Sequence, residues 1–422
     1  MSESQRGRVV IVGAGMAGVQ TAVHLRQLGF DGPVRLLGAE PHPPYDRPPL
    51  SKAVLLGQAE ESAFEVDFAA LDVELELGRE VTGLRADQRL LVTDAGPVAY
   101  DWLVLATGAV PRALPGAEDT PGAYPLHTLD DVVRLRPLLA ERRPTLVVGA
   151  GWIGAEFTTA ARTAGCPVTV VEAGPHPLPG VLPAEVAEPM RRWYEEVGAT
   201  LLTGRPVRAV HRHGVTLEPE PGAEPGELSA DAVVVGVGSR PATDWLAGSG
   251  VERDGAGAVT ADAWLRTSVP GVYAVGDCAS FPSARYGRRL LVHHWDNALR
   301  GSQVVAANLL AESRGDTALA EGVRYDPVPY FWSEQFGRFV QYAGHHADGD
   351  LLLWRGDPGE PAWSVCWLRR EPEGDRLVAL LAVGRPRDLT QGRKLIEGGA
   401  RLDPTVAADA SVPLKKAVTK GA

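Results

Sequence analysis

Apolar residues near the start of the chain form short unbroken runs, and a longer stretch separates the first two of them. The runs occupy residues 9–12 and 34–37, and the stretch between them is helical in pattern over 19–28. Unbroken apolar runs are typical of strands that are buried on both faces of a parallel sheet. This order therefore predicts a strand–helix–strand unit with parallel strands.

The same order occurs a second time, which makes the chain an internal repeat. Apolar runs at 145–148 and 168–171 flank a helical stretch over about 155–164. Each repeat ends in a further apolar strand, within 100–112 and 230–241, that closes with glycine, proline and arginine. Ligands bind at the C-terminal ends of parallel strands, so these closing segments are expected to line a ligand crevice.

Both repeats carry the residues of a dinucleotide-binding turn. A GxGxxG motif follows the first strand and an acid closes the second. The residues are Gly13, Gly15, Gly18 and Glu40 in the first repeat, and Gly149, Gly151, Gly154 and Glu172 in the second. The first glycine permits the tight turn, the second lets the backbone approach a pyrophosphate, and the third lets the helix pack against the strand. The helix N-terminus then faces the phosphates, and the acid accepts hydrogen bonds from a ribose diol.

Charge and cysteine content narrow the class of function. The formal net charge of −11 argues against a nucleic-acid partner. Cys166, Cys278 and Cys366 lie far apart, so we expect neither a redox dithiol nor a metal site. The adjacent His293 and His294 are poor joint ligands for a metal, and we expect them to be structural. No apolar run approaches the roughly 20 residues of a membrane helix, so we expect a cytoplasmic protein without a membrane partner.

Two further segments connect the chain to a known group. They are YDRPPLSK, from Tyr45 to Lys52, and VYAVGD, from Val272 to Asp277. With the two glycine turns, they make the chain resemble the two-dinucleotide-binding-domain flavoproteins over essentially its whole length. Within that group it is similar to the ferredoxin reductases of the putidaredoxin reductase type, which serve cytochrome P450s and ring-hydroxylating dioxygenases.

The resemblance implies an α/β fold of glutathione-reductase-like architecture, with two Rossmann-like domains and a C-terminal α+β domain. A chain of 422 residues is too long for one ordinary core, which agrees with several domains. The implied boundaries are 1–113 and 243–325 for a discontinuous FAD-binding domain, 114–242 for an NAD(H)-binding domain, and 326–422 for a C-terminal interface domain.

The resemblance also implies which residues bind FAD. In this group the arginine of the RPPLSK motif nears the pyrophosphate, the lysine nears the flavin ring, and the aspartate of the second motif binds a ribityl hydroxyl. The implied set is Gly13, Ala14, Gly15, Met16, Ala17, Gly18, Glu40, Arg47, Lys52, Val81, Ala106, Thr107, Gly108, Arg112, Gly276, Asp277, Trp295, Ala298 and Trp332.

NAD(H) is implied to bind the second repeat. The residues are Gly149, Gly151, Trp152, Ile153, Gly154, Glu156, Glu172, Gly236, Val237 and Gly238. Glu172 favours NADH over NADPH, because a carboxylate accepts from a free 2′-hydroxyl and repels a 2′-phosphate. Residues 173–176 offer no arginine to receive such a phosphate.

Lys52 and Glu156 are predicted to be the catalytic pair. In related flavoproteins a matching lysine and glutamate form an ion pair beside the flavin, where the lysine stabilises charge on the reduced ring and the glutamate organises the nicotinamide side. The alternative is that Glu156 only favours the N-terminus of its helix.

The expected electron acceptor is a [2Fe–2S] ferredoxin. Without a thiol relay, electrons must leave the flavin directly. From Arg376 to the end, the sequence has nine basic and four acidic residues, which would suit an acidic partner if they share one face. The alternative is a scatter of solvated charges. Two other functions stay open: reduction of rubredoxin, a quinone or a small molecule, and NADH sensing of the apoptosis-inducing-factor type.

Overall fold

The structure is a computed structural model that describes residues 7–117, 120–219, 224–315 and 322–419. The chain folds into two compact units, each built from three separate segments. Unit 1 consists of Met1–Asp46, Ala63–Val110 and Arg240–Phe331, and unit 2 of Arg47–Ser62, Pro111–Ser239 and Trp332–Ala422.

Unit 1 is organised around a five-stranded parallel sheet. Its strand order is β19-β7-β1-β2-β3. The strands are β1 (Val9–Val12), β2 (Val34–Leu37), β3 (Val73–Glu76), β7 (Trp102–Leu105) and β19 (Val272–Ala274). Every residue of β1 is buried, as an unbroken apolar run in a central parallel strand predicts.

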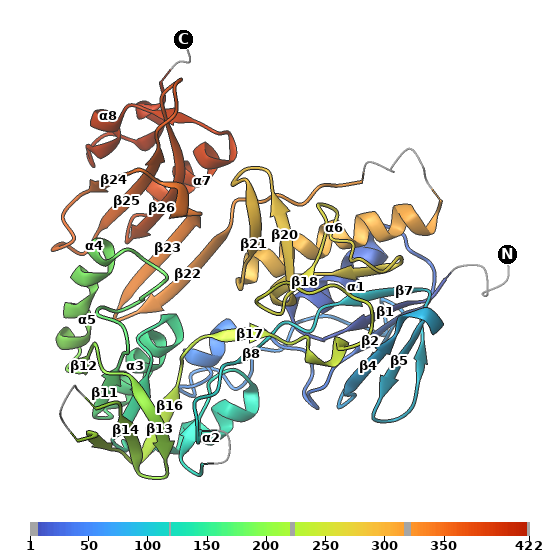
Figure 1. The fold of residues 1–422 in the computed structure, drawn as a ribbon, viewed down its shortest axis with the longest axis horizontal. Helices are drawn as coiled ribbons and strands as arrows, with labels where there is room; N and C mark the ends of the chain where they lie inside the picture. Colours follow the sequence, from blue (N-terminus) through green and yellow to red (C-terminus); the bar gives the residue numbers. More distant parts are fainter. Residues whose placement is uncertain (1–6, 118–119, 220–223, 316–321, 420–422) are drawn as a thin grey trace. The chain divides into compact units, whose positions relative to one another are not determined.

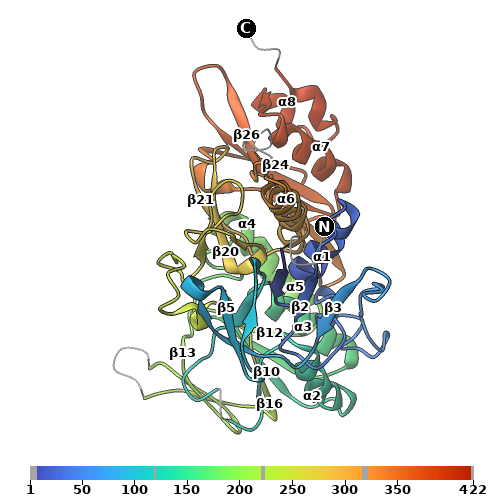
Figure 2. The ribbon, with the colours of Figure 1, turned by 90° about the vertical axis from the view of Figure 1, so that its right-hand side faces the viewer.

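Two helices of unit 1 pack against each other. They are α1 (Met16–Gln27), which follows β1, and α6 (Trp295–Ser313). Figures 1 and 2 show α1 and α6 side by side in both views. Val19, Ala22 and Leu25 of α1 and Val305 and Leu309 of α6 belong to one buried apolar cluster.

Smaller elements complete unit 1. Antiparallel β4 (Val81–Arg85), β5 (Leu90–Thr93) and β6 (Val98–Ala99) form one three-stranded sheet, and β18 (Val259–Thr260), β20 (Ala279–Ser283) and β21 (Arg288–Leu291) form another. The 3₁₀ turns are η3 (Ala86–Gln88), η5 (Asp244–Leu246) and η6 (Gly276–Cys278). The short strands β8 (Ala109–Pro111) and β17 (Ser239–Pro241) each contain residues of both units, and they form a two-stranded sheet of their own.

Unit 2 contains a second five-stranded parallel sheet, in the order β12-β11-β10-β16-β9. The strands are β9 (Ala123–Tyr124), β10 (Thr145–Val148), β11 (Val168–Val171), β12 (Thr200–Leu202) and β16 (Ala232–Val235). The helices are α2 (Leu129–Ala140), α3 (Trp152–Ala164), α4 (Ala184–Ala187) and α5 (Arg191–Glu196), with the 3₁₀ turns η2 (Pro48–Ser51) and η4 (Glu188–Met190). A small antiparallel sheet joins β13 (Val207–His211), β14 (Gly214–Leu217) and β15 (Glu227–Ser229).

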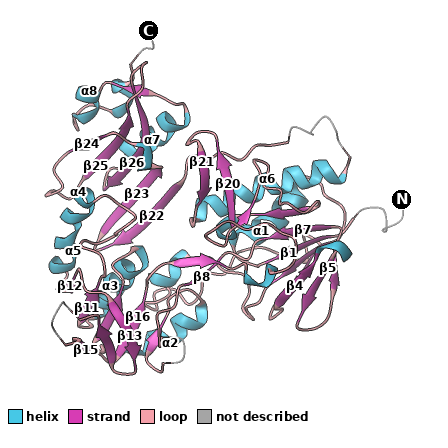
Figure 3. Cartoon of the chain, viewed as in Figure 1, coloured by secondary structure: helices cyan, strands magenta, loops and turns pink. Residues whose placement is uncertain are grey.

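The C-terminal part of unit 2 is an antiparallel sheet with helices. The strand order is β22-β23-β26-β25-β24, with β27 paired to the start of β26. The strands are β22 (Tyr330–Gln335), β23 (Arg338–Gly344), β24 (Leu351–Arg355), β25 (Trp363–Arg369), β26 (Asp375–Val383) and β27 (Arg401–Leu402). The helices and 3₁₀ turns are η8 (His346–Asp348), α7 (Pro386–Glu397), α8 (Pro404–Ala408) and η9 (Leu414–Ala417). Figure 3 shows α7 and α8 beside these strands.

The predicted fold class is confirmed, with two Rossmann-like parallel sheets and a C-terminal α+β part. The helices start earlier than the apolar pattern indicated. Each begins directly after the second glycine of its motif, since Gly15 and Gly151 are the N-cap residues of α1 and α3. The first turns, Met16–Gly18 and Trp152–Gly154, lie within the glycine motifs and contain a glycine, which is a poor helix former, so the apolar pattern alone did not assign them to the helices.

Candidate functional site

Three adjacent strands of unit 1 bring their C-terminal segments together. A Cβ placed on Gly13, after β1, would lie 2.2 Å from the carbonyl oxygen of Ala106, which follows β7. A Cβ placed on Gly276, in η6 after β19, would lie 3.1 Å from Cβ of Ala17 and 3.8 Å from Cβ of Ala298. Residues predicted to bind FAD from four separate segments therefore line one edge of this sheet.

The glycine turn of unit 1 has the geometry that a pyrophosphate requires. Gly13 has φ +108°, which favours glycine, and a Cβ on Gly18 would lie 1.8 Å from the carbonyl oxygen of Gly13. Apart from Gly15 itself and the residues on either side of it, no atom of the described residues lies within 4 Å of a Cβ built on Gly15. The third glycine is thus needed for packing, whereas the second, between Ala14 and Met16, faces a space that a side chain would enter and a ligand can fill.

Glu40, three residues after β2, lies in a network of hydrogen bonds. Glu40 Oε2 accepts a hydrogen bond from the Tyr45 hydroxyl at 2.5 Å. The backbone N–H of Gly78 donates to the Glu40 carbonyl at 3.0 Å, and that of Arg79 donates to the Gly38 carbonyl. Val81, two residues further, begins β4, so the structure brings the predicted ribose and adenine residues of unit 1 into one region.

The remaining predicted residues of unit 1 are also positioned by local contacts. Asp277 is partly exposed in η6, and its neighbours Gly276 and Cys278 are buried. Trp295 Nε1 donates to Asp46 Oδ1 at 2.9 Å. The Thr107 hydroxyl donates to the Ala242 carbonyl at 2.8 Å, and Gly108 follows with φ +69°.

His294 is held uncharged beside these residues. Its ring stacks on Phe331 with centroids 4.5 Å apart. Burial, with a smaller contribution from the neighbouring His293, lowers the pKa of His294 to about 4. The ring therefore acts as a neutral packing group, and the described residues contain no cluster of His, Cys, Asp and Glu that could hold a metal ion.

We expect His294 to destabilise the FAD-loaded protein in acid. The unfolded chain binds a proton on this residue below pH 6.5, but the folded chain does so only near pH 4. The stabilisation is therefore complete above pH 6.5 and is lost as the pH falls towards 4, by about 2–3 kcal/mol. Urea unfolding of His294→Phe, which keeps the stacking without the proton, should show a shallower loss between pH 7 and 4.5. Parallel curves for the two proteins would contradict the assignment.

Unit 2 repeats the turn geometry of unit 1. A Cβ on Gly154 would lie 2.0 Å from the carbonyl oxygen of Gly149, whereas one on Gly151 has its nearest neighbour at 3.9 Å. Gly149 has φ +101°, and a Cβ there would lie 2.4 Å from the carbonyl oxygen of Gly236. The structure thus places the predicted segment from Gly236 through Val237 to Gly238 beside the turn. Trp152 and Ile153 begin α3, and Ile153 is 42% exposed.

Glu172 is buried and accepts a hydrogen bond from the backbone of the second glycine turn. Its Oε2 accepts from the backbone N–H of Ala150 at 2.8 Å, and its Oε1 from that of Gly174 at 2.7 Å. Each carboxylate oxygen has a second acceptor site, so the same group can also accept from a ribose hydroxyl. Arg112 donates through its backbone N–H to the Gly238 carbonyl at 2.9 Å.

The predicted catalytic pair is in contact. Lys52 Nζ lies 2.7 Å from Glu156 Oε2, and the two side chains are 21% and 7% exposed. η2, which ends next to Lys52, packs against α3, which carries Glu156. The guanidinium of Arg47 donates to the His127 carbonyl at 2.6 Å.

Two serines that were not predicted from the sequence belong to this cluster. The Ser51 hydroxyl donates to Glu156 Oε2, and the Ser333 hydroxyl donates to Oε1 at 2.7 Å. Ser51 lies in the YDRPPLSK segment, before Lys52, and Ser333 follows Trp332, which was predicted to bind FAD. Nothing in their spacing indicated that they meet one carboxylate, since Ser333 comes from a strand of the C-terminal sheet.

The chain matches two protein-family models. Residues 7–302 match the family model described as pyridine nucleotide-disulphide oxidoreductase, and residues 330–418 match the one described as reductase C-terminal. No helix among the described residues is long and apolar enough to span a bilayer.

Similar proteins cover nearly the whole chain. The ferredoxin–NAD(+) reductase component of the anthranilate 1,2-dioxygenase system of Burkholderia cepacia is 36% identical, over 96% of this chain and 98% of the relative. Rhodocoxin reductase of Rhodococcus erythropolis is 34% identical, over 98% and 94%. Among solved structures, Fdr9 has a TM-score of 0.88 at 43% identity, covering 96% of this chain and 99% of that one. The covalent complex of putidaredoxin reductase and putidaredoxin has a TM-score of 0.87 at 31% identity, with 97% of each chain covered.

Proposed function

Because the chain belongs to the pyridine nucleotide-disulphide oxidoreductase family, we propose that it oxidises NADH and reduces a [2Fe–2S] ferredoxin that feeds a cytochrome P450 or Rieske-type oxygenase. FAD and NAD(H) are its cofactors. The observation that carries the proposal is the pair of dinucleotide turns, each with a packed third glycine and an open second one. When bound, FAD supplies the chemistry that takes up a hydride and releases electrons one at a time.

The cofactor residues are proposed as follows. The residues proposed to hold FAD are those of the first turn, Glu40, Arg47, Lys52, Val81, Ala106–Gly108, Arg112, Gly276, Asp277, Trp295, Ala298 and Trp332. NADH is held by the second turn with Trp152 and Ile153, and by Glu156, Glu172 and the segment from Gly236 to Gly238. The carboxylate of Glu172 supports NADH, since a 2′-phosphate would be repelled by it. The three-domain boundaries given above and a cytoplasmic location are part of the proposal.

Lys52 and Glu156 are proposed to act as one electrostatic unit. Lys52 keeps a positive charge close to the reacting ring, and Glu156 compensates that charge and orients the ammonium group. Because the pair is largely buried, its interaction is stronger than that of a surface ion pair.

The properties of the three cysteines are consistent with electron transfer from the flavin to a partner without a thiol relay. Cys166, Cys278 and Cys366 are buried and unbridged. Burial raises the pKa of each thiol, that of Cys366 to about 12, which disfavours the reactive thiolate. None of them has the properties of a thiol relay.

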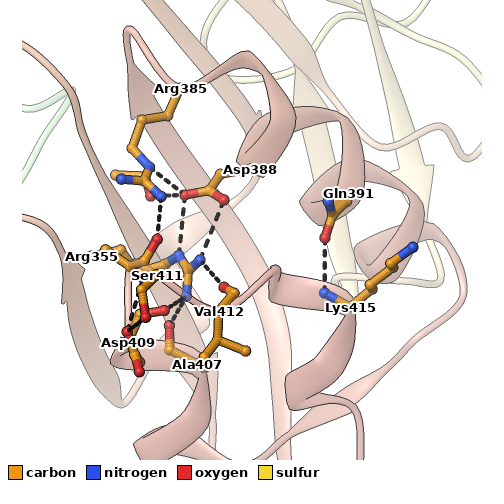
Figure 4. A network of polar contacts seen from close by, with 11 residues as sticks. Arg355, Arg385, Asp388, Gln391, Ala407, Asp409, Ser411, Val412 and Lys415 are labelled. Carbon is orange, nitrogen blue, oxygen red and sulfur yellow. Dashed lines mark hydrogen bonds and ion pairs between the residues drawn. The ribbon is translucent and has the colours of Figure 1, made fainter.

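A compact basic surface on the C-terminal part is proposed to receive the ferredoxin. Of the basic residues after Arg376, Arg385 and Arg401 are taken up in ion pairs, as is Arg376 itself. On α7, exposed Arg387 and Lys394 have the i, i+7 spacing of one helix face. Gln391 lies between them in sequence and accepts from the backbone N–H of Lys415, which places Lys415 beside that face (Figure 4). Lys415 and the following residue, Lys416, are both exposed. We call these four basic residues the basic surface.

Charge reversal of the basic surface should slow ferredoxin reduction without affecting NADH oxidation by the flavin. For Lys415→Glu/Lys416→Glu we expect about a tenfold lower ferredoxin-dependent rate at low salt and a weaker salt dependence. Flavin bleaching by NADH should keep its rate. Arg208→Glu, which reverses an exposed charge on β13, is the matched control and should leave both rates unchanged. Equal losses in both variants would contradict this docking surface.

The proposed function is tested by NADH-driven cytochrome c reduction with the yellow FAD-loaded protein, with and without a [2Fe–2S] ferredoxin. A large ferredoxin-dependent increase is expected. Rapid flavin bleaching by NADH without any increase, across several ferredoxins, would disprove the acceptor and leave the cofactor assignments in place.

A further inference from the structure

The carboxylate of Glu156 receives donors from two segments distant from each other in the sequence. Lys52 Nζ and the Ser51 hydroxyl both reach Oε2, from the segment around η2. The Ser333 hydroxyl reaches Oε1 at 2.7 Å, from β22. Both carboxylate oxygens are therefore held, one by each segment, which restricts the rotation of the group.

Burial makes these donors necessary. Glu156 is 6% exposed, Ser51 is 4% exposed and Ser333 is 1% exposed. A buried carboxylate that loses a donor keeps its desolvation cost and gains no water in return. Without the Ser333 hydroxyl, Oε1 would be unsatisfied and the carboxylate could rotate away from Lys52.

A second bond fixes β22 along the same helix. The backbone N–H of Phe336 donates to the Thr159 hydroxyl at 2.8 Å. Glu156 and Thr159 have the i, i+3 spacing of one helix face, so the end of β22 and the turn after it run along that face of α3. The Phe336 ring also packs on Tyr194, with centroids 4.5 Å apart.

We propose that Ser333 is a positioning residue for hydride transfer, acting through the carboxylate of Glu156 on the Lys52 ammonium group. This inference rests on the proposed function, which identifies the reaction as NADH oxidation. It assigns a role in that reaction to a residue of the C-terminal sheet. Successive residues of a strand point to opposite faces. Ser333 therefore also sets the direction of Trp332, which is partly exposed.

The test compares Ser333→Ala with a matched control in the same sheet. Ser364, in β25, is fully buried and donates to a different buried carboxylate, that of Asp388, at 2.8 Å. Ser333→Ala and Ser364→Ala thus each remove one hydroxyl donor from a buried acid. In the FAD-loaded enzyme, the rate of flavin bleaching by NADH should fall about tenfold in Ser333→Ala only, as expected for one hydrogen bond to a charged group. Ser333→Thr, which keeps the hydroxyl, should restore most of that rate.

A second readout does not depend on turnover. The rate at which Lys52 is reductively methylated, followed by peptide mass spectrometry, should rise severalfold in Ser333→Ala and remain at the wild-type value in Ser364→Ala. Wild-type bleaching and methylation rates in Ser333→Ala, or equal changes in both alanine variants, would overturn the proposal. Both readouts concern only the NADH half of the reaction, so they remain valid if no ferredoxin is reduced.

Discussion

Gly154→Ala is expected to abolish NADH oxidation in a protein that still binds FAD. The added Cβ would lie 2.0 Å from the backbone carbonyl oxygen of Gly149, within the same turn, so no side chain can move to accommodate it. α3 must then shift away from β10, and it carries Glu156 with it. Displacements of about 1 Å in an active site cost on the order of a hundredfold in rate. We expect at least that loss in the bleaching of the flavin by NADH.

Two matched glycine variants separate the causes. A Cβ on Gly151 would have its nearest neighbour at 3.9 Å, so Gly151→Ala should fold with wild-type stability. It should bind NADH more weakly, because the added methyl group enters the space for the pyrophosphate. A Cβ on Gly18 would lie 1.8 Å from the carbonyl oxygen of Gly13, so Gly18→Ala should instead give a protein without flavin. Absorbance at the flavin band and stopped-flow bleaching distinguish the three outcomes. Normal bleaching in Gly154→Ala would contradict the geometry of the second turn.

Much of this architecture could be predicted because its determinants are local in the sequence. A GxGxxG motif requires close backbone approaches within one turn, and the structure shows them at Gly18 and Gly154. The contact of Lys52 with Glu156 is a long-range one, and it was predicted from the resemblance alone. The residue types alone could not distinguish a glutamate that pairs with Lys52 from one that only favours the N-terminus of its own helix.

The contacts that could not be predicted depend on how the C-terminal sheet packs. Ser333 meets Glu156 because β22 runs along α3, and no residue spacing encodes that arrangement. The basic residues after Arg376 illustrate the same limit. Their number can be counted in the sequence, but whether the Arg385 side chain faces solvent or pairs with Asp388 depends on local packing at the start of α7. Arg355 would be expected at the surface from its residue type, yet its side chain has no exposed area.

Replacing Arg355 should cause the largest loss of stability in the C-terminal part. The guanidinium pairs with Asp388 and also donates to the backbone carbonyls of Ala407, Asp409 and Val412 (Figure 4). Burial alone would raise the pKa of Asp388, but hydrogen bonds from Arg355 and Ser364, with Arg385 nearby, hold that pKa below its usual value. Arg355→Met leaves a buried charge with fewer partners and three carbonyls without their donor, at a cost of about 3–5 kcal/mol.

The effect of Arg355→Met should spread to the basic surface. The three carbonyls belong to the segment that leads to Lys415 and Lys416, so hydrogen exchange of residues 403–418 should accelerate and ferredoxin-dependent turnover should fall. Arg401→Met is the matched control, because Arg401 also pairs with acids but is 32% exposed. It should cost no more than about 1 kcal/mol. If urea unfolding gave the same midpoint for both variants, the buried guanidinium would not anchor the C-terminal segment, and the position of the basic surface would need another cause.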